Sequence, residues 1–201
     1  MRQLRIANLD VLEHGQGDIT LILMHGAGAG QRHPFMAAVS DGIAAQGIRV
    51  VTFDFPYLSA GRKLPDRPPV LLAALDEVVR AMTAPSLFVG GKSLGGRMAA
   101  TWLLHGGQAR GFVALGYPLC PPKPQPQRAE VLAAVRKPGL IIQGSDDEFG
   151  SPSLLAATAP AQVLVHELPG TDHSFGARKR GLADVVGEVT SLTAAFLLTA
   201  S

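Results

Sequence analysis

Short runs of apolar residues recur along the chain, each bounded by glycine, proline or polar residues. Strands that are buried on both faces of a sheet have this continuous apolar pattern, although a short run can also belong to a buried helix. We expect six such strands, at residues 19–24, 48–53, 87–89, 112–115, 140–142 and 163–165. The opening segment, residues 4–13, favours one or two antiparallel edge strands.

Longer segments with helical spacing separate these runs. Apolar residues recur every three or four positions over 70–82 and over 182–196, which predicts two amphipathic helices. Pro34 and Gly47 bound a further helix, and another covers 94–105 and ends at Gly106. Strands that alternate with helices imply right-handed crossovers and a mostly parallel sheet covered on both faces. The sequence therefore predicts a three-layer α/β fold in a single domain, residues 1–201.

Composition and charge narrow the class of protein. The formal net charge is only +2 and the basic residues are scattered, so no nucleic-acid footprint stands out. Cys120 is the only cysteine, which excludes an intramolecular disulfide and favours a reducing compartment. The start lacks the apolar stretch of a secretory signal, and the apolar run 194–200 is shorter than the roughly 20 residues that span a bilayer. We expect a cytoplasmic protein that binds neither nucleic acid nor a membrane, and the oligomeric state stays open.

The strongest local motif is Gly91-Lys92-Ser93-Leu94-Gly95, which follows an expected strand and opens an expected helix. In a nucleophile elbow the glycines permit a tight turn that lifts the serine hydroxyl above the sheet. A glycine-rich turn with a helix-capping serine is the plainer alternative. A phosphate-binding P-loop fits less well, because it needs glycine five residues before Gly91, where Ser86 stands.

A second glycine-rich segment, His-Gly-Ala-Gly-Ala-Gly at residues 25–30, directly follows the strand at 19–24. Small residues let backbone N–H groups point at a ligand, as an oxyanion hole requires, and the N–H groups of Ala27 and Leu94 are the expected donors. A dinucleotide-binding fingerprint is a weaker match, because the third glycine arrives one position early. A plain turn is the remaining alternative.

Two later loops carry an acid and a histidine. Residues 143–150 contain Asp146 and Asp147, and residues 170–175 contain His173. Serine, acid and histidine follow one another in the order typical of α/β-hydrolases. Ligands bind beyond the carboxyl ends of the strands in an open parallel sheet, so these side chains are expected to converge on one rim.

The remaining polar residues carry less weight. Asp54 follows the strand at 48–53 and either caps the next turn or contacts substrate. His14 and His33 are interpreted as loop residues, His105 as a helix-end residue and His166 as a strand residue. No pair of histidines has the spacing of a metal site.

These motifs resemble the α/β-hydrolase superfamily, specifically its small, lidless, dienelactone-hydrolase-like members, which include relatives of an animal testis-expressed protein and a chromatin-complex subunit. The resemblance covers nearly the whole chain. It implies Ser93 as nucleophile, His173 as general base, Asp147 as the acid that orients the histidine, and Ala27 and Leu94 as oxyanion donors. Asp147 matches the position of the acid in the family turn, while substitution by the neighbouring carboxylate stays open.

The resemblance predicts a serine hydrolase that cleaves a small carboxylic ester or related acyl substrate without a metal or organic cofactor. Dienelactone hydrolase itself uses cysteine where this chain has serine. We expect His25, Gly26, Asp54 and Lys92 to contribute to substrate binding. The proline-rich segment 117–127 is expected to form a stiff wall rather than a helical lid. The alternative is a non-catalytic binding or scaffold protein that retains the fold, as the chromatin-linked relatives show.

Overall fold

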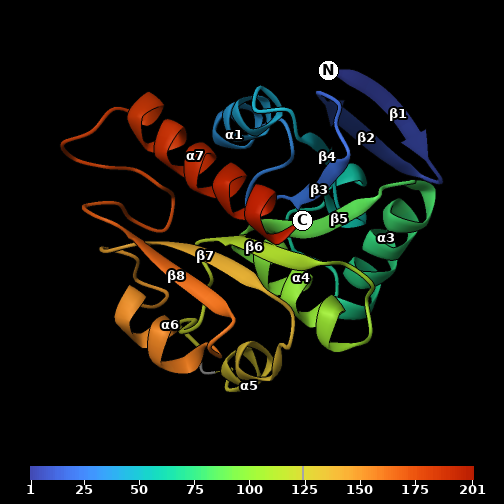
Figure 1. The fold of residues 1–201 in the computed structure, drawn as a ribbon. Coiled ribbons are helices and arrows are strands. Elements are labelled where there is room, and N and C mark those ends of the chain that lie inside the picture. The colour runs from blue at the N-terminus through green and yellow to red at the C-terminus, as the bar shows by residue number, and fades with distance from the viewer. Residues whose placement is uncertain (124) are drawn as a thin grey trace.

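The computed structural model describes residues 1–123 and 125–201, and within them the strands form one eight-stranded sheet. Its order is β1-β2-β4-β3-β5-β6-β7-β8. β1 and β2 run antiparallel to their neighbours and the other strands are parallel (Figure 1). The strands are β1 (Arg2–Ile6), β2 (Leu9–His14), β3 (Ile19–Met24), β4 (Arg49–Phe53), β5 (Ser86–Lys92), β6 (Gly111–Leu115), β7 (Gly139–Gly144) and β8 (Val163–Leu168).

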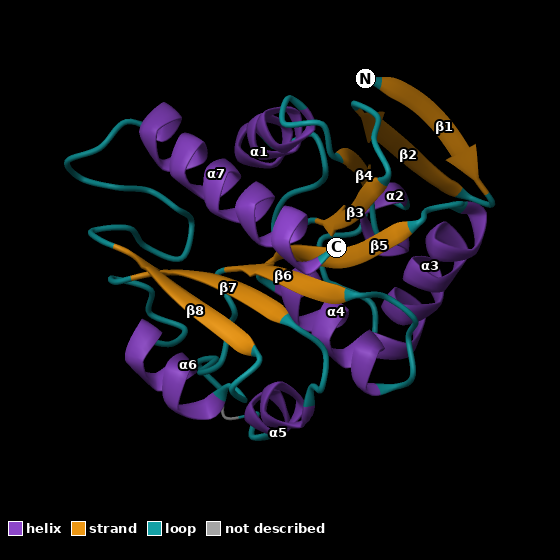
Figure 2. Cartoon of the chain, viewed as in Figure 1, coloured by secondary structure: helices purple, strands orange, loops and turns teal. Residues whose placement is uncertain are grey.

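Helices cover both faces of this sheet, which confirms the predicted three-layer α/β architecture. The helices are α1 (Pro34–Ala44), α2 (Pro56–Ser59), α3 (Pro68–Ala81), α4 (Leu94–Leu104), α5 (Gln127–Ala134), α6 (Pro152–Thr158) and α7 (Leu182–Ala200). Figure 2 shows α1 and α7 on one face and α3 to α6 on the other. No large cap domain is present in the part of the chain that the structure describes.

Both faces of the central strands are buried, as the continuous apolar runs predicted. Along β3, Leu21 and Leu23 pack towards α1 and α7, whereas Ile22 and Met24 pack towards the helices on the opposite face. α7 is long and apolar enough to span a membrane by length and composition, with 19 residues. It nevertheless packs against α1, and its Val189 and Leu197 are buried in the core. Its apolar stripe is therefore used within the fold.

The strand order creates a switch point between β3 and β5. The chain passes from β3 to β4 on one side and then crosses back to β5 on the other. Met24 at the end of β3 pairs with Gly91, and Lys92 at the end of β5 pairs with Leu115. The loops that follow these strands are consequently adjacent at the carboxyl edge, where open α/β sheets bind ligands.

Three local expectations need correction or extension. His14 is not a loop residue: it ends β2, pairs with Val50, and places its buried Nδ1 2.7 Å from Oδ1 of Asp41. α2 and α6 were not expected, because each has only one or two turns and shows too little periodicity. Most of the segment 117–127 is irregular as expected, but α5 begins at Gln127, and Pro124 lies outside the described residues.

Candidate active site

Ser93 occupies a strained turn between β5 and α4. Its backbone has φ 49° and ψ −107°, a conformation that costs a non-glycine residue about 1–3 kcal/mol and needs support from its surroundings. The Ser93 N–H donates a 2.9 Å hydrogen bond to the carbonyl of Leu115. A Cβ at Gly91 or Gly95 would lie 2.3 or 2.4 Å from the carbonyl oxygen of Met24. The two glycines therefore permit the close approach that this turn requires.

A hydrogen-bonded chain links Ser93 to two loops at the same edge of the sheet. Nε2 of His173 lies 2.9 Å from the Ser93 hydroxyl oxygen, and Nδ1 lies 2.8 Å from Oδ2 of Asp147. A carboxylate can only accept, so Nδ1 carries the proton and Nε2 is left to accept from the serine. The Asp147 side chain is fully buried, while that of His173 is 15% exposed. This arrangement can remove a proton from the serine hydroxyl.

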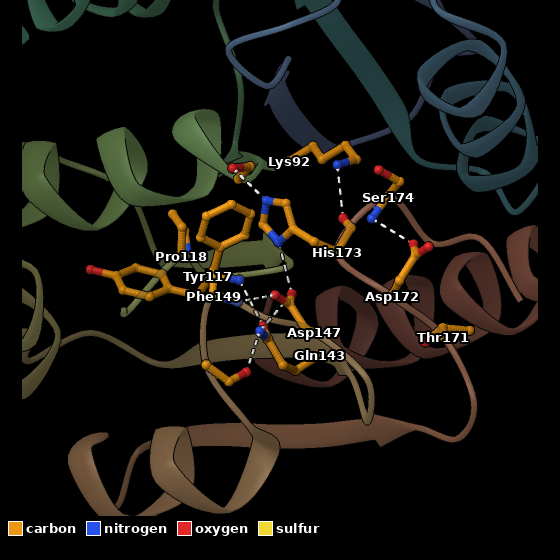
Figure 3. A network of polar contacts seen from close by, with 12 residues as sticks. Lys92, Tyr117, Pro118, Gln143, Asp147, Phe149, Thr171, Asp172, His173 and Ser174 are labelled. Carbon is orange, nitrogen blue, oxygen red and sulfur yellow. Dashed lines mark hydrogen bonds and ion pairs between the residues drawn. The ribbon is translucent and has the colours of Figure 1, made fainter. Parts of the chain in front are cut away.

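The acid is held by a residue to which sequence reasoning gave no role. Nε2 of Gln143, at the end of β7, donates to Oδ2 of Asp147 at 2.7 Å and to the carbonyl of Gly150 at 2.9 Å (Figure 3). Oε1 of Gln143 accepts from the N–H of Tyr117 at 2.8 Å. Oδ1 of Asp147 accepts from the N–H of Phe149 at 2.8 Å. These contacts fix both carboxylate oxygens.

The neighbouring acid takes no part in this chain. Asp146 is exposed, and its Oδ1 accepts from the hydroxyl of Ser145 at 2.9 Å. Of the two adjacent acids, it is therefore Asp147 that the fold turns towards His173.

The histidine loop is fixed from two sides. Oδ1 of Asp172 accepts from the N–H groups of Ser174 and Gly176 at 2.8 and 2.9 Å, which closes a tight turn. Gly116 lies beside the imidazole with φ 71°, a left-handed conformation that favours glycine, and a Cβ there would be in ordinary contact with Nδ1 of His173 at 3.4 Å. The Phe149 ring packs edge-on against the imidazole at 4.4 Å between centroids.

Lys92 supports the histidine loop and also faces a cavity. Its Nζ donates to the carbonyl of His173 at 3.0 Å, as Figure 3 shows. Burial lowers the pKa of the Lys92 ammonium, although Asp147 and Asp172 partly offset the effect. Lys92 and Gly26 both line a cavity next to Ser93, so the structure places these two predicted substrate-binding residues where such contact is possible.

The two expected oxyanion donors flank Ser93. Leu94 is the first residue of α4, so its N–H has no acceptor within the helix. Ala27 lines the same cavity as Leu94 and Ser93, and its carbonyl accepts from the hydroxyl of Tyr57 at 2.9 Å. The N-terminal end of α4 adds a favourable dipole for negative charge.

The expectation that His25 and Asp54 contribute to substrate binding needs correction, because both side chains hold the 25–30 loop in place. The His25 side chain is fully buried, and its Nε2 accepts from the N–H of Phe55 at 3.0 Å while Nδ1 lies 2.6 Å from the carbonyl of Gly26. Burial lowers the pKa of His25, which agrees with this neutral form. Asp54 accepts from the N–H of Gln31 at 2.7 Å instead of capping its own turn. Neither side chain lines the cavities beside Ser93.

Two cavities meet at Ser93 and His173, with volumes of about 250 and 420 Å³. The smaller cavity is bordered by Arg97 of α4 and Arg128 of α5, which sequence reasoning did not single out. Nothing in the sequence marked them, because a single arginine on a helix is usually a solvated residue. Among residues 1–123 and 125–201, no three His, Cys, Asp or Glu side chains are grouped as metal ligands.

Comparisons with known proteins agree with this fold. Solved structures with similar folds include an α/β serine hydrolase homologue from Coxiella burnetii, with 16% identity, a TM-score of 0.74, and coverage of 96% of this chain and 95% of that chain. Est1E from Butyrivibrio proteoclasticus has 14% identity and a TM-score of 0.72 and covers 98% of both chains. XC6422 from Xanthomonas campestris, a serine hydrolase without a lid, has 20% identity and a TM-score of 0.69 over 91% of this chain and 87% of that chain.

The family comparison covers most of the sequence. Residues 17–197 match the family model described as an alpha/beta hydrolase domain. This match confirms the predicted resemblance to the α/β-hydrolase superfamily, and the fold is similar to that of a serine hydrolase without a lid. The chain belongs to the α/β-hydrolase family.

Proposed function

We propose that this protein is a serine hydrolase that cleaves small carboxylic esters or related acyl substrates through Ser93, His173 and Asp147. The observation that carries the proposal is the continuous hydrogen-bonded chain from Asp147 through His173 to the hydroxyl of Ser93. That chain ends on a strained turn beside two cavities. Each residue thus has the partner that its role in acyl transfer requires.

The reaction proceeds in two halves. Nε2 of His173 takes the proton of the Ser93 hydroxyl while the oxygen attacks the acyl carbon, and the same proton then passes to the departing alcohol. Water next attacks the acyl-enzyme: its proton goes to His173 and its hydroxyl to the acyl carbon. The carboxylic acid leaves as Ser93 recovers its proton. Asp147 holds the imidazole in the required tautomer and stabilises the imidazolium that forms twice in each cycle.

The N–H groups of Ala27 and Leu94 bind the oxygen that becomes negatively charged in both tetrahedral intermediates. Such donors act more strongly in the transition state than on the neutral substrate, and losing one costs about 10²–10³ in kcat. The mechanism draws on no metal or organic cofactor.

The structural neighbours support an ester-like substrate. Est1E has also been solved with ferulic acid bound, and another neighbour is the esterase domain of a Rhodothermus marinus protein. Ferulic acid is a carboxylic acid, and carboxylic acids are what ester hydrolysis releases. The bound acid in that relative therefore agrees with an ester substrate. We extend only the reaction class to this chain.

The deciding experiment compares Ser93→Ala with wild type in the hydrolysis of p-nitrophenyl acetate and in labelling by a fluorophosphonate probe. Ser93→Ala is expected to lose about 10⁴–10⁶ in kcat and all labelling. Ser153→Ala, an exposed serine on α6, is the matched control and is expected to behave as wild type. Activity of Ser93→Ala within tenfold of wild type would reject the mechanism. A wild-type protein that neither turns over esters nor reacts with the probe would favour the binding or scaffold alternative.

A further inference from the structure

Arg97 lies one helical turn beyond the proposed nucleophile. Its backbone N–H donates to the carbonyl of Ser93 at 3.1 Å in the first turn of α4. Residues four apart on a helix share a face, and one turn advances by about 5.4 Å. The cavity of about 250 Å³ that Ser93 and His173 line is also bordered by Arg97. Arg97 therefore brings a positive charge to the wall of the cavity into which the scissile carbonyl would bind.

The guanidinium of Arg97 has no anionic partner in the part of the chain that the structure describes. Within residues 1–123 and 125–201 it makes neither a salt bridge nor a side-chain hydrogen bond, and burial lowers its pKa. An ionised Tyr117 would offset the charge, but its buried hydroxyl donates to the carbonyl of Arg128 and has a raised pKa. It therefore stays neutral. A half-buried cation without a counter-ion is costly unless something else supplies the negative charge.

Arg128 adds a second positive charge to the wall of this cavity. Arg128 uses Nη1 on the carbonyl of Pro118 at 2.7 Å and Nε on Oε1 of Gln125 at 3.0 Å, and both of these acceptors are uncharged. Burial lowers the pKa of Arg128, and the charge of Arg97 lowers it further. Both side chains also line a neighbouring cavity of about 270 Å³, so they form the partition between the two spaces.

The carboxylate that borders the active-site cavity is already neutralised. Both oxygens of Asp66 accept from Arg62, at 2.6 and 3.1 Å. Asp66 therefore already has a cationic partner, and it makes no ion pair with Arg97 among the described residues. The cavity beside Ser93 keeps a net positive wall.

We propose that Arg97 and Arg128 bind a carboxylate carried by the substrate itself, a few bonds from the carbonyl that Ser93 attacks. This inference rests on the proposed serine hydrolase function and names its substrate class: half-esters of short dicarboxylic acids. A succinate half-ester, with two methylenes between carbonyl and carboxylate, is a short member of this class for the cavity of about 250 Å³ that Ser93 and Arg97 both line. Guanidinium groups suit this task because their paired donors match a carboxylate in plane.

The test compares p-nitrophenyl hemisuccinate with p-nitrophenyl butyrate, each rate divided by its uncatalysed hydrolysis rate. Wild type is expected to favour the hemisuccinate by about tenfold to a hundredfold in kcat/KM, the effect of hydrogen bonds to a charged group. Arg97→Gln is expected to lose most of that preference while changing butyrate hydrolysis less than threefold, and Arg97→Lys to keep part of it. Arg80→Gln removes the same charge from an exposed site at the end of α3 and is expected to keep the preference.

A second measurement does not depend on turnover. Calorimetry with succinanilic acid and butyranilide, the unreactive amide analogues, is expected to show tighter binding of the anion by wild type and loss of that difference in Arg97→Gln. Equal rates on the two esters, or equal loss of both in Arg97→Gln, would overturn the inference while leaving the serine mechanism intact. If no ester is cleaved and no serine is labelled, the proposed function fails, and the calorimetry alone decides whether the anion site exists.

Discussion

Gln143 and Asp147 share a hydrogen bond of 2.7 Å, made to the carboxylate oxygen that also faces Nδ1 of His173 at 2.8 Å. The same amide nitrogen binds the carbonyl of Gly150, and the amide oxygen accepts from Tyr117. One buried side chain therefore ties the end of β6, the acid and the end of the acid loop together. Its position decides where the acceptor for the histidine proton lies.

Replacement of Gln143 tests this positioning role. Gln143→Met leaves buried polar groups without partners, so we expect the free energy of unfolding to fall by about 2 kcal/mol. We also expect kcat for p-nitrophenyl acetate to fall about tenfold to a hundredfold, because the acid is no longer fixed. Gln143→Glu should be worse, since it sets a second carboxylate beside Asp147. Urea unfolding and steady-state kinetics check both effects, and a folded Gln143→Glu variant with wild-type kcat would show that Gln143 serves structure alone.

The two adjacent acids offer a matched pair of variants. Asp147→Asn is expected to lower kcat about 10⁴-fold, because the asparagine amide no longer enforces the histidine tautomer. Asp146→Asn changes an exposed side chain that does not contact His173, so its kcat should stay within about threefold of wild type. The ratio of the two kcat values at saturating ester is the measurement. The opposite ranking would mean that the loop rearranges when substrate binds.

At position 93, glycine should give a more stable protein than alanine, which reverses the usual order of the two residues. Glycine normally destabilises a folded chain relative to alanine, but at φ 49° the strain of a Cβ exceeds that cost. We expect Ser93→Gly to unfold with a free energy about 1 kcal/mol higher than Ser93→Ala, as measured by urea denaturation. Neither variant should turn over ester. Equal stabilities, or a less stable glycine variant, would indicate that the turn relaxes when the hydroxyl is removed.

The sequence predicted the layered fold and the convergence of Ser93, Asp147 and His173, because both follow from where strands end. A parallel sheet brings the carboxyl ends of its strands to one edge whatever the loops contain. The sequence did not reveal that His25 is a buried support of the 25–30 loop. A histidine that follows a strand has the same sequence pattern whether its side chain faces a cavity or the core. Contacts between distant segments decide that difference.

Gln143 and Arg97 were missed for related reasons. A glutamine at a strand end has no distinctive spacing, and its partners Tyr117 and Gly150 become neighbours only through the register of β6 and β7. Arg97 has no ion-pair partner among the described residues, and Asp66, which lines the same cavity, is paired with Arg62. The sequence pattern does not indicate which charged side chains form ion pairs in the folded protein.

Lys92 gives the protein a specific pH dependence of stability. Burial lowers its pKa from the ordinary value of 10.5, so the unfolded chain binds more protons than the folded chain between the two values. The free energy of unfolding therefore rises with pH through that window. The destabilisation caused by burying the ammonium is fully present below the pKa of Lys92 in the folded state. Lys92→Met removes this contribution. We expect the difference in free energy of unfolding, wild type minus Lys92→Met, to increase as the pH rises towards 10.5, and urea unfolding at each pH measures it. A flat difference would show that the ammonium is well solvated in the folded state.

The cavity beside Ser93 should favour short uncharged acyl chains. Proline residues dominate the outer wall of the smaller cavity, with Pro65, Pro118, Pro121 and Pro122 all lining it. Proline fixes φ and lacks a backbone donor, so this wall is stiff and offers few large apolar side chains to cover a long chain. The chain also passes from β6 to α5 without a cap domain among the described residues. We therefore expect kcat/KM for neutral p-nitrophenyl esters to be highest at about two to four acyl carbons, since a longer chain would leave its additional methylenes in water.

The rate should not jump above the critical micelle concentration of the substrate, because no helical lid has to open at a lipid surface. A preference for about ten or more carbons together with such a jump would show that the proline wall moves to open an acyl tunnel.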